Sequence, residues 1–209
     1  TPYQLVNNNL FTFKSTYLTN DLKLSLHVGH FINNLQEFDK WTRPAFDLTI
    51  NQTQLSPNAR YKLDDFIFNL GSQLSILDNK NNQDERLMPD ASSLSIGPYV
   101  TIDYEGNNFG FNYGIRYDYK SIISEDNYSN TDYDEQFSNT SFSSGIYFDL
   151  EDHILRLSYS GAYRAPHFSE LFSEGVHHGT NRYEIGNINL DIEQANQIDL
   201  KYQWANEHF

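Results

Sequence analysis

The chain has 209 residues, a mean hydropathy of -0.63 and 38% hydrophobic residues. It has no run of about 18 apolar residues, which excludes a transmembrane helix. A transmembrane β-barrel is still allowed, because its strands need apolar residues only at alternate positions. The net charge of -14 argues against nucleic acid as a partner, and the absence of cysteine excludes thiol catalysis and cysteine-based zinc sites.

Aromatic residues are abundant, with 15 tyrosines and 15 phenylalanines against one methionine. Aromatic girdles at the two bilayer interfaces of a barrel would use them, and so would the core of a soluble β-sandwich. The chain opens Thr-Pro-Tyr, without the basic and apolar segments of a signal peptide. We therefore expect an exported protein with this sequence to begin further upstream.

Alternation with a period of two predicts nine strands, near residues 8–18, 21–33, 44–55, 60–76, 93–104, 109–120, 140–149, 153–163 and 195–205. In residues 109–120 every odd position is aromatic or isoleucine, and every even position is glycine, asparagine or charged. Such a strand can meet hydrocarbon on one side and only water on the other. Other strands repeat the design; in one of them the apolar face is Phe46, Leu48 and Ile50.

The connections alternate between short and long. Four tight turns are expected, at Asn20, Ser56–Ala59, Glu105–Asn108 and Leu150–Asp152. Four long loops are expected, at Asn34–Arg43, Leu77–Ser92, Ser121–Asn139 and Arg164–Gln194. Outer-membrane barrels have tight periplasmic turns and long extracellular loops, whereas a Greek-key sandwich does not sort its loops in this way. The sequence therefore predicts an all-β fold, the wall of an antiparallel up-and-down transmembrane β-barrel.

Nine strands cannot close a single-chain bacterial barrel, which needs an even number. Phe209 also falls on the opposite parity from the apolar face that includes Trp204, so it does not look like the last residue of a closed barrel. We therefore interpret the chain as a fragment of a larger barrel.

Three motifs lie between Tyr159 and Trp204, at residues 163–166 (Tyr-Arg-Ala-Pro), 169–172 (Ser-Glu-Leu-Phe) and 186–193 (Gly-Asn-x-Asn-Leu-x-x-Glu). Together they closely resemble the corresponding segment of TonB-dependent outer-membrane receptors. Residues 114–118 are similar to the family's Gly-x-Arg-Tyr-Asp strand. The chain departs from the family pattern where Ile188 and Ile192 replace proline and Ala195 replaces serine.

The resemblance implies that residues 1–209 are part of a receptor's β-barrel domain, about nine strands of a 22-stranded barrel in the bacterial outer membrane, with the plug domain and other strands outside this chain. It implies uptake of a scarce nutrient, most readily a ferric siderophore or another metal chelate, with zinc, haem and vitamin B12 as further cargoes. The implied partners are this small-molecule cargo, membrane lipid, lipopolysaccharide and a TonB-type energy transducer acting through the missing N-terminal region. No intrinsic cofactor and no enzymatic activity are expected.

Candidate cargo contacts lie in the longest predicted loop: His167, Glu170, Glu174, His177, His178, Arg182 and Glu184. Imidazole and carboxylate groups suit zinc or iron, and neighbouring glycines would let His177 and His178 meet one ion across a turn. The more frequent role of such a pair is to be solvated and hydrogen-bonded to the wall. Structural roles are expected for four other residues, namely Arg164 and Pro166 at a strand end and Arg116 and Asp118 in a wall charge network.

Two other functions fit part of the sequence. A different outer-membrane barrel, such as a porin-like channel or an adhesin, would share the alternation but not the three motifs. A soluble carbohydrate-binding β-sandwich would need a second sheet to cover the aromatic face.

Overall fold

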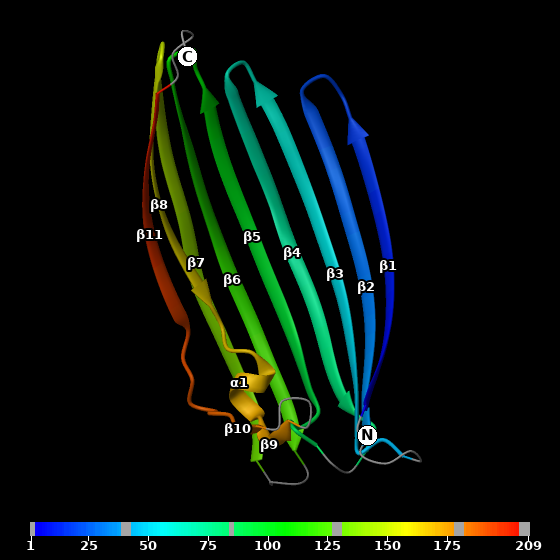
Figure 1. Cartoon of the computed structure of the whole chain (residues 1–209). Helices are drawn as coiled ribbons and strands as arrows, with labels where there is room; N and C mark the ends of the chain where they lie inside the picture. The colour runs from blue at the N-terminus through cyan, green and yellow to red at the C-terminus, as the bar shows by residue number, and fades with distance from the viewer. Residues whose placement is uncertain (1–2, 39–42, 84–85, 127–130, 178–181, 205–209) are drawn as a thin grey trace.

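The computed structural model describes residues 3–38, 43–83, 86–126, 131–177 and 182–204. Nine long strands form one antiparallel sheet in which neighbours in sequence are neighbours in space (Figure 1). They are β1 (Tyr3–Leu18), β2 (Leu22–Phe38), β3 (Phe46–Leu63), β4 (Phe66–Asn81), β5 (Ala91–Glu105), β6 (Phe109–Asp126), β7 (Thr131–Leu150), β8 (His153–Arg164) and β11 (Glu193–Trp204). The predicted up-and-down wall of nine strands is confirmed.

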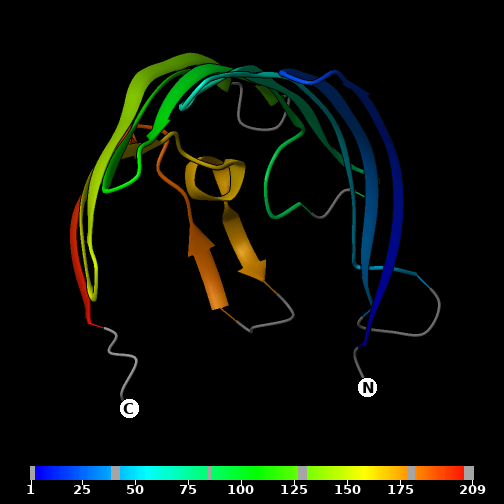
Figure 2. The same ribbon diagram turned by 90° about the horizontal axis from the view of Figure 1, so that it is seen from above.

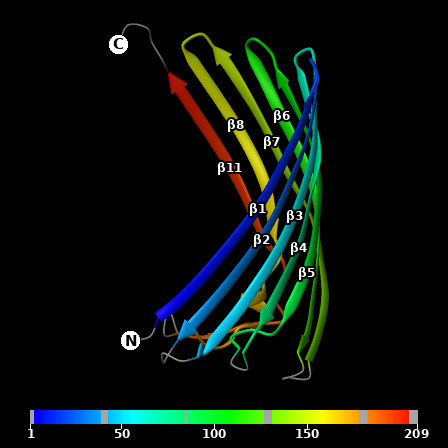
Figure 3. The ribbon, with the colours of Figure 1, turned by 90° about the vertical axis from the view of Figure 1, so that its right-hand side faces the viewer.

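The sheet is curved like a segment of a cylinder (Figure 2). Seen from its β1 side, the strands at the two ends of the sheet slope in opposite directions across the view, as tilted strands of a barrel wall do (Figure 3). A short helix, α1 (Phe168–Phe172), and a two-stranded sheet of β9 (Glu174–His177) and β10 (Arg182–Ile185) lie inside the curve. In the part of the chain that the structure describes, no helix is long and apolar enough to cross a membrane.

The strand register assigns each side chain to the convex or the concave face. Ile122 of β6 belongs to one buried cluster with Phe168 and Leu171 of α1, and α1 lies inside the curve. The even-numbered side chains of β6 therefore face the concave side, and the odd-numbered ones from Phe109 to Tyr119 face the convex side.

Strand pairing carries this apolar surface across the whole sheet. We call it the convex band, and its members include Leu24, Leu70, Val100, Ile115, Leu157 and Leu200. Several are more than half exposed, with Leu70 at 63% and Leu200 at 70%. A continuous apolar surface of this kind is typical of the lipid-facing side of a barrel.

Aromatic rings gather on the convex band close to the tight turns. The Tyr104 ring centroid lies 4.9 Å from that of Phe66, 5.2 Å from Phe109 and 5.4 Å from Phe111. This cluster spans three strands, β4 to β6, at the end of the sheet opposite α1. Its position fits an aromatic girdle at one edge of an apolar band.

The predicted tight turn at Ser56–Ala59 is wrong. β3 continues through these residues to Leu63, and the chain turns at Asp64–Asp65, where Asp64 has a φ of 51°. Aspartate tolerates this left-handed conformation better than most residues. Pro57 has no N–H, and it falls in a gap of the β3–β4 ladder between the pairs Leu55–Leu74 and Asn58–Gly71. A proline that suggested a turn is therefore accommodated inside a strand.

The strands also extend into the predicted long loops. The predicted loop Ser121–Asn139 is wrong for most of its length, because β6 runs to Asp126 and β7 begins at Thr131. At this loop end of the sheet the polarity of the two faces changes. Phe46 and Leu48 are buried on the concave side, while Asp47 lies on the convex side, so the apolar face of this segment does not belong to the convex band.

Candidate functional site

The segment between β8 and β11, which we call the insert, contains α1, β9 and β10 and lies on the concave side at the loop end (Figures 1 and 2). Its α1 helix packs against the wall through the side chains of Phe168 and Leu171, which are 3% and 1% exposed. They join Ile122, Tyr133 and Phe137 of the wall in the main buried cluster. Apolar burial therefore holds the insert against β6 and β7.

Arg164 joins the two points where the insert leaves and rejoins the wall. Its Nη1 and Nη2 donate to the two carboxylate oxygens of Glu170, at 2.8 and 2.9 Å. Its Nη2 and Nε donate to Oε2 of Glu193, at 2.7 and 3.0 Å. Glu193 is also the residue opposite Arg164 in the β8–β11 ladder. One guanidinium thus ties the first turn of α1 to both strands.

His167 and Glu170 cap α1. The Glu170 carboxylate accepts from the His167 backbone N–H at 2.8 Å, and the His167 side chain accepts from the Ser169 N–H at 3.4 Å. The hydrogen bonds from Arg164 and from this backbone N–H lower the pKa of Glu170 to about 2. Burial, and then the charge of Lys120, lower the pKa of His167. At neutral pH the cap therefore consists of a carboxylate and an uncharged imidazole.

Two other motif residues, Pro166 and Gly186, have separate structural roles. Pro166 is buried, and its carbonyl accepts from Nζ of Lys120 at 2.9 Å. Gly186 lies against α1: its N–H donates to the Ser173 carbonyl at 2.5 Å, and a Cβ built on it would be 2.5 Å from the Leu171 carbonyl oxygen. Only glycine allows this approach, because any side chain would meet backbone.

Two cavities lie beside the insert. The first, which we call the Ser173 pocket, has a volume of about 330 Å³ and is lined by Pro89, Ser124, Tyr133, Leu171, Phe172, Ser173, Glu174, Ile185, Gly186 and Ile188. The second, the Glu184 pocket, has a volume of about 270 Å³ and is lined by Leu35, Glu37, Phe46, Leu48, Leu87, Met88, Ser169, Val176 and Glu184. Both are bounded by the wall on one side and by the insert on the other.

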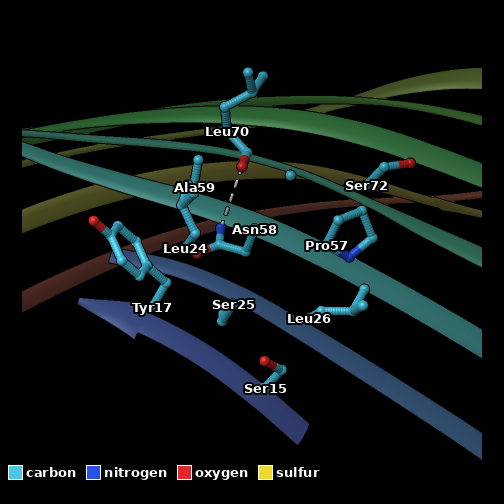
Figure 4. Close-up of a pocket in the computed structure, with 11 residues that line it drawn as sticks. Ser15, Tyr17, Leu24, Ser25, Leu26, Pro57, Asn58, Ala59, Leu70 and Ser72 are labelled. Carbon is cyan, nitrogen blue, oxygen red and sulfur yellow. Dashed lines mark hydrogen bonds between the residues drawn. The ribbon is translucent and has the colours of Figure 1, made fainter. Parts of the chain in front are cut away.

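A larger hollow of about 500 Å³ lies on the convex side, across β1 to β4 (Figure 4). It forms where small or short side chains such as Ser15, Ala59 and Ser72 interrupt the convex band. Asn58 Nδ2 donates to the Leu70 carbonyl there, at 3.5 Å. Because this hollow opens away from the insert, it is not part of the candidate site.

The predicted cargo contacts fall in different surroundings. Glu174 lines the Ser173 pocket, Glu184 lines the Glu184 pocket beside the buried Glu37, and both Glu170 oxygens are bonded to Arg164. Arg182 is exposed at the start of β10, opposite the backbone of His177 in the β9–β10 ladder. His178 lies outside the described residues.

No group of three or more His, Cys, Asp or Glu residues that could hold a metal ion occurs in the ranges that the structure describes. The role of the His177–His178 pair as a metal site therefore stays a prediction. Sequence reasoning missed Glu37, Tyr133 and Ser173. Tyr133 stands in an acidic stretch that looked like an exposed loop, and only its alternation with Phe137 on one face of a strand could have identified it.

The predicted wall charge pair is present on β6. Nε of Arg116 lies 2.7 Å from Oδ1 of Asp118, and both side chains are on the concave face. Gly97 of β5 leaves the space that the guanidinium fills, because a Cβ there would collide with it. These residues lie on the wall away from the two pockets, as a structural pair would.

A curved antiparallel sheet with an apolar convex face, tight turns at one end and long connections at the other defines the wall of an outer-membrane β-barrel. A family model described as "TonB dependent receptor-like, beta-barrel" matches residues 2–209. The chain therefore belongs to the TonB-dependent receptor β-barrel family, whose members are outer-membrane receptors and transporters. This result excludes the porin-like, adhesin and β-sandwich alternatives.

Solved structures of the same fold include two transporters and a receptor. The FrpB iron transporter of Neisseria meningitidis superposes with a TM-score of 0.74 at 14% identity, covering 99% of this chain and 36% of that one. The Serratia marcescens hemophore receptor HasR, in complex with its hemophore HasA and heme, gives 0.71 at 12% identity, with 97% and 37% covered. The copper transporter OprC gives 0.70 at 15% identity, with 97% and 36% covered. The chain thus spans little more than a third of these proteins.

Proposed function

We propose that this chain forms part of the barrel wall of an outer-membrane receptor that takes up a metal chelate, most readily a ferric siderophore, with energy from a TonB-type transducer. The single observation that carries this proposal is the insert. In a member of this family, a segment docked on the concave face at the loop end stands where a molecule entering the barrel would pass. The two cavities that the insert bounds are surfaces on which such a molecule could bind.

The named neighbours support a metal-related cargo. They are an iron transporter, a copper transporter and a hemophore receptor in complex with its hemophore and heme. The FyuA receptor of Yersinia pestis, a ferric yersiniabactin uptake receptor, has the same fold with a TM-score of 0.58 at 12% identity. At such identities the comparison supports the fold directly and the cargo only by analogy. Zinc, haem and vitamin B12 are the alternative cargoes.

Lipid contact follows from the same proposal. The convex band would meet the hydrocarbon of the outer membrane, and the polar convex surface at the loop end would meet lipopolysaccharide. The transducer would act on a part of the receptor other than this stretch of the wall. The receptor would carry out no covalent chemistry on its cargo.

The proposal is tested by uptake into cells. The complete parent receptor would be expressed in an outer membrane, and entry of radiolabelled ferric chelates, zinc, haem and vitamin B12 would be measured with and without the TonB energy source. We expect energy-dependent entry of a ferric chelate. Energy-dependent entry of vitamin B12 alone would reject the ferric siderophore as the cargo, and no energy-dependent entry of any of these metal compounds would reject the metal-chelate proposal.

The predicted histidine pair is tested in the same assay. A receptor with both His177 and His178 changed to alanine loses uptake if the pair binds the cargo or its metal. Unchanged uptake would show that the pair is only part of the scaffold. A variant with His153, which lies at the tight-turn end of β8, changed to alanine serves as the matched control.

A further inference from the structure

Among the described residues, two that line the Ser173 pocket carry a buried hydroxyl group without a hydrogen-bond partner. The Tyr133 hydroxyl and the Ser173 Oγ are both unpartnered, and the two residues are 7% and 3% exposed. Buried polar groups are nearly always hydrogen-bonded, because burying one without a partner is costly. Two such groups in the wall of one cavity point to something that binds there.

The third hydroxyl of the pocket shows the contrast. Ser124 is also 3% exposed, but its Oγ donates to the Asp90 carbonyl at 2.8 Å. The local structure can therefore satisfy a buried serine with a neighbouring carbonyl. The missing partners of Tyr133 and Ser173 are a property of these two positions and not of the whole region.

The lining of the pocket indicates the charge of the ligand. Glu174 is its only charged lining residue among the described residues, and no lysine, arginine or histidine lines it. An anion would meet a carboxylate without a compensating cation, so an anionic ligand is disfavoured. The hydroxyls can donate to oxygen atoms of a ligand, and Glu174 can accept from a ligand hydroxyl.

The remaining walls are apolar and aromatic. Leu171, Phe172, Ile185 and Ile188 line the pocket, and the Phe172 ring meets Tyr133 edge to face at 4.9 Å between centroids. A volume of about 330 Å³ is at the lower end of the range of about 300–1,000 Å³ for small-molecule sites. The pocket is large enough for one arm or ring of a cargo molecule, but not for a whole siderophore.

We propose that the Ser173 pocket binds an uncharged, oxygen-bearing group of the cargo, with the Tyr133 and Ser173 hydroxyls as donors and Glu174 as an acceptor. This inference rests on the proposed function and narrows it to cargoes that present a neutral surface. An electrically neutral ferric trihydroxamate chelate and a sugar share this chemistry, since both present carbonyl or hydroxyl oxygens next to apolar carbon.

Binding to the purified complete receptor in detergent tests the proposal. Calorimetric titrations would use a neutral ferric trihydroxamate, a linear maltooligosaccharide and an anionic ferric tricatecholate. We expect one neutral probe to bind more tightly than the tricatecholate. Tyr133→Phe and Ser173→Ala remove only the hydroxyls, and each should weaken binding of that neutral probe by about tenfold, the loss expected for one good hydrogen bond.

Two controls separate binding from folding. Tyr147→Phe and Ser143→Ala make the same chemical changes on the concave face of β7, outside the pocket, and should leave the affinity unchanged. Thermal unfolding without ligand should show Tyr133→Phe and Ser173→Ala at least as stable as the parent, because an unpartnered buried hydroxyl has been removed. A purely structural role for the two hydroxyls would instead lower the unfolding temperature and leave the affinity unchanged.

The outcomes distinguish this inference from the proposed function. Energy-dependent uptake of a ferric chelate by a receptor whose affinity is insensitive to both hydroxyl substitutions would overturn the pocket assignment and leave the receptor function standing. Tighter binding of the tricatecholate, or binding of neither neutral probe, would also overturn it. Hydroxyl-dependent binding of the maltooligosaccharide alone would support the pocket while rejecting a metal chelate as the cargo.

Discussion

The two ends of the sheet follow opposite rules for which face is apolar. Near the tight turns the convex face is apolar, as at Ile115 and Leu157, and the concave face carries charges such as Arg116. At the loop end the concave face is apolar, as at Ile122 and Leu48, and the convex face carries polar groups. Strands pass from one end to the other without a break.

Asp47 illustrates the polar convex surface of the loop end. Its carboxylate accepts from the side-chain amides of Asn34, Gln36 and Asn82, at 2.7, 2.6 and 2.9 Å. This cluster would be out of place in hydrocarbon and is suited to an aqueous or headgroup environment. The comparison shows that alternation in the sequence reveals that the two faces of a strand have different environments, but not which face is which. The face that is apolar is the one that contacts lipid near the tight turns and the one that contacts the insert at the loop end.

The largest expected effect concerns the apolar concave surface at the loop end. Leu171→Ala should lower the free energy of opening the insert by about 2–5 kcal/mol, because it leaves a cavity in the cluster around Ile122. Hydrogen exchange of the α1 amides, followed by mass spectrometry on the complete receptor, measures this opening. Ile185→Ala is the control, since Ile185 is 80% exposed and should change exchange little. Equal effects of the two substitutions would contradict the packing described for α1.

The convex band gives the second test. Ile115→Arg places a charge in the band and should destabilise the barrel by about 2–4 kcal/mol if the site lies near the bilayer midplane. Gln136→Arg is the matched substitution on the convex face at the loop end, where Gln136 is exposed, and its effect should stay within about 0.5 kcal/mol. Denaturant-induced unfolding from lipid bilayers gives both values. A similar cost at the two positions would remove the distinction between the two ends.

Gly186 provides a smaller effect with a close control. Gly186→Ala brings a Cβ to 2.5 Å from the Leu171 carbonyl oxygen and should weaken docking of the insert by about 1–3 kcal/mol. Gly175→Ala introduces the same methyl where the nearest atom, Leu87 Cδ1, is 3.6 Å away. Exchange of the α1 amides should therefore accelerate only in the first variant. Acceleration in both would show that the loss of glycine flexibility, and not the collision, is responsible.

The smallest expected effect is the pH dependence of the α1 cap. The pKa of Glu170 is about 2 in the folded protein, below the ordinary value of 4.5, so its stabilising contribution is complete above pH 4.5 and is lost as the pH falls toward 2. The lowered pKa of His167 acts in the same direction, because its contribution is complete above pH 6.5 and declines as the pH falls below that value.

Comparing Glu170→Gln with the parent receptor at pH 7 and at pH 3 measures the first contribution. The variant should open its insert more readily at pH 7, and the difference from the parent should shrink at pH 3. Because the paired side chains of Arg164 and Glu170 are partly exposed, at 55% and 39%, the difference is expected to be small and to decrease with added salt. A difference that grows on acidification would show that the Arg164–Glu170 pair does not stabilise the insert.

Much of the wall could be predicted from alternation alone, and the failures have identifiable causes. Residues 109–120 correctly predicted β6, because over that length the convex side chains are all apolar and the concave ones are all glycine, polar or charged. Pro57 and Asn58 suggested a turn from composition, but the ladder gap that accommodates the proline depends on the neighbouring strand. Phe46 was assigned to the wrong environment because local alternation cannot reveal that the insert covers the concave face at that point.

The site was less predictable than the wall. The motif residues Arg164, Glu170 and Gly186 pointed to the correct segment. Their contacts with Glu193 and α1 could not be predicted, because they form only when β11 pairs with β8 after the insert. Tyr133 and Ser173 are far apart in sequence and carry no local signal of a shared cavity. Pockets made by segments that meet only in three dimensions cannot be read from spacing.

The pairing of Arg164 with Glu193 has a consequence for how such receptors diversify. The chain leaves the sheet after Arg164 and re-enters it at Glu193, the residue directly opposite. The strands β8 and β11 are therefore paired neighbours, whatever the length of the segment between them. Residues can be gained, lost or exchanged between these two positions without shifting any other strand in the ladder. The insert can therefore change in length and sequence while the strands of the wall keep their pairing.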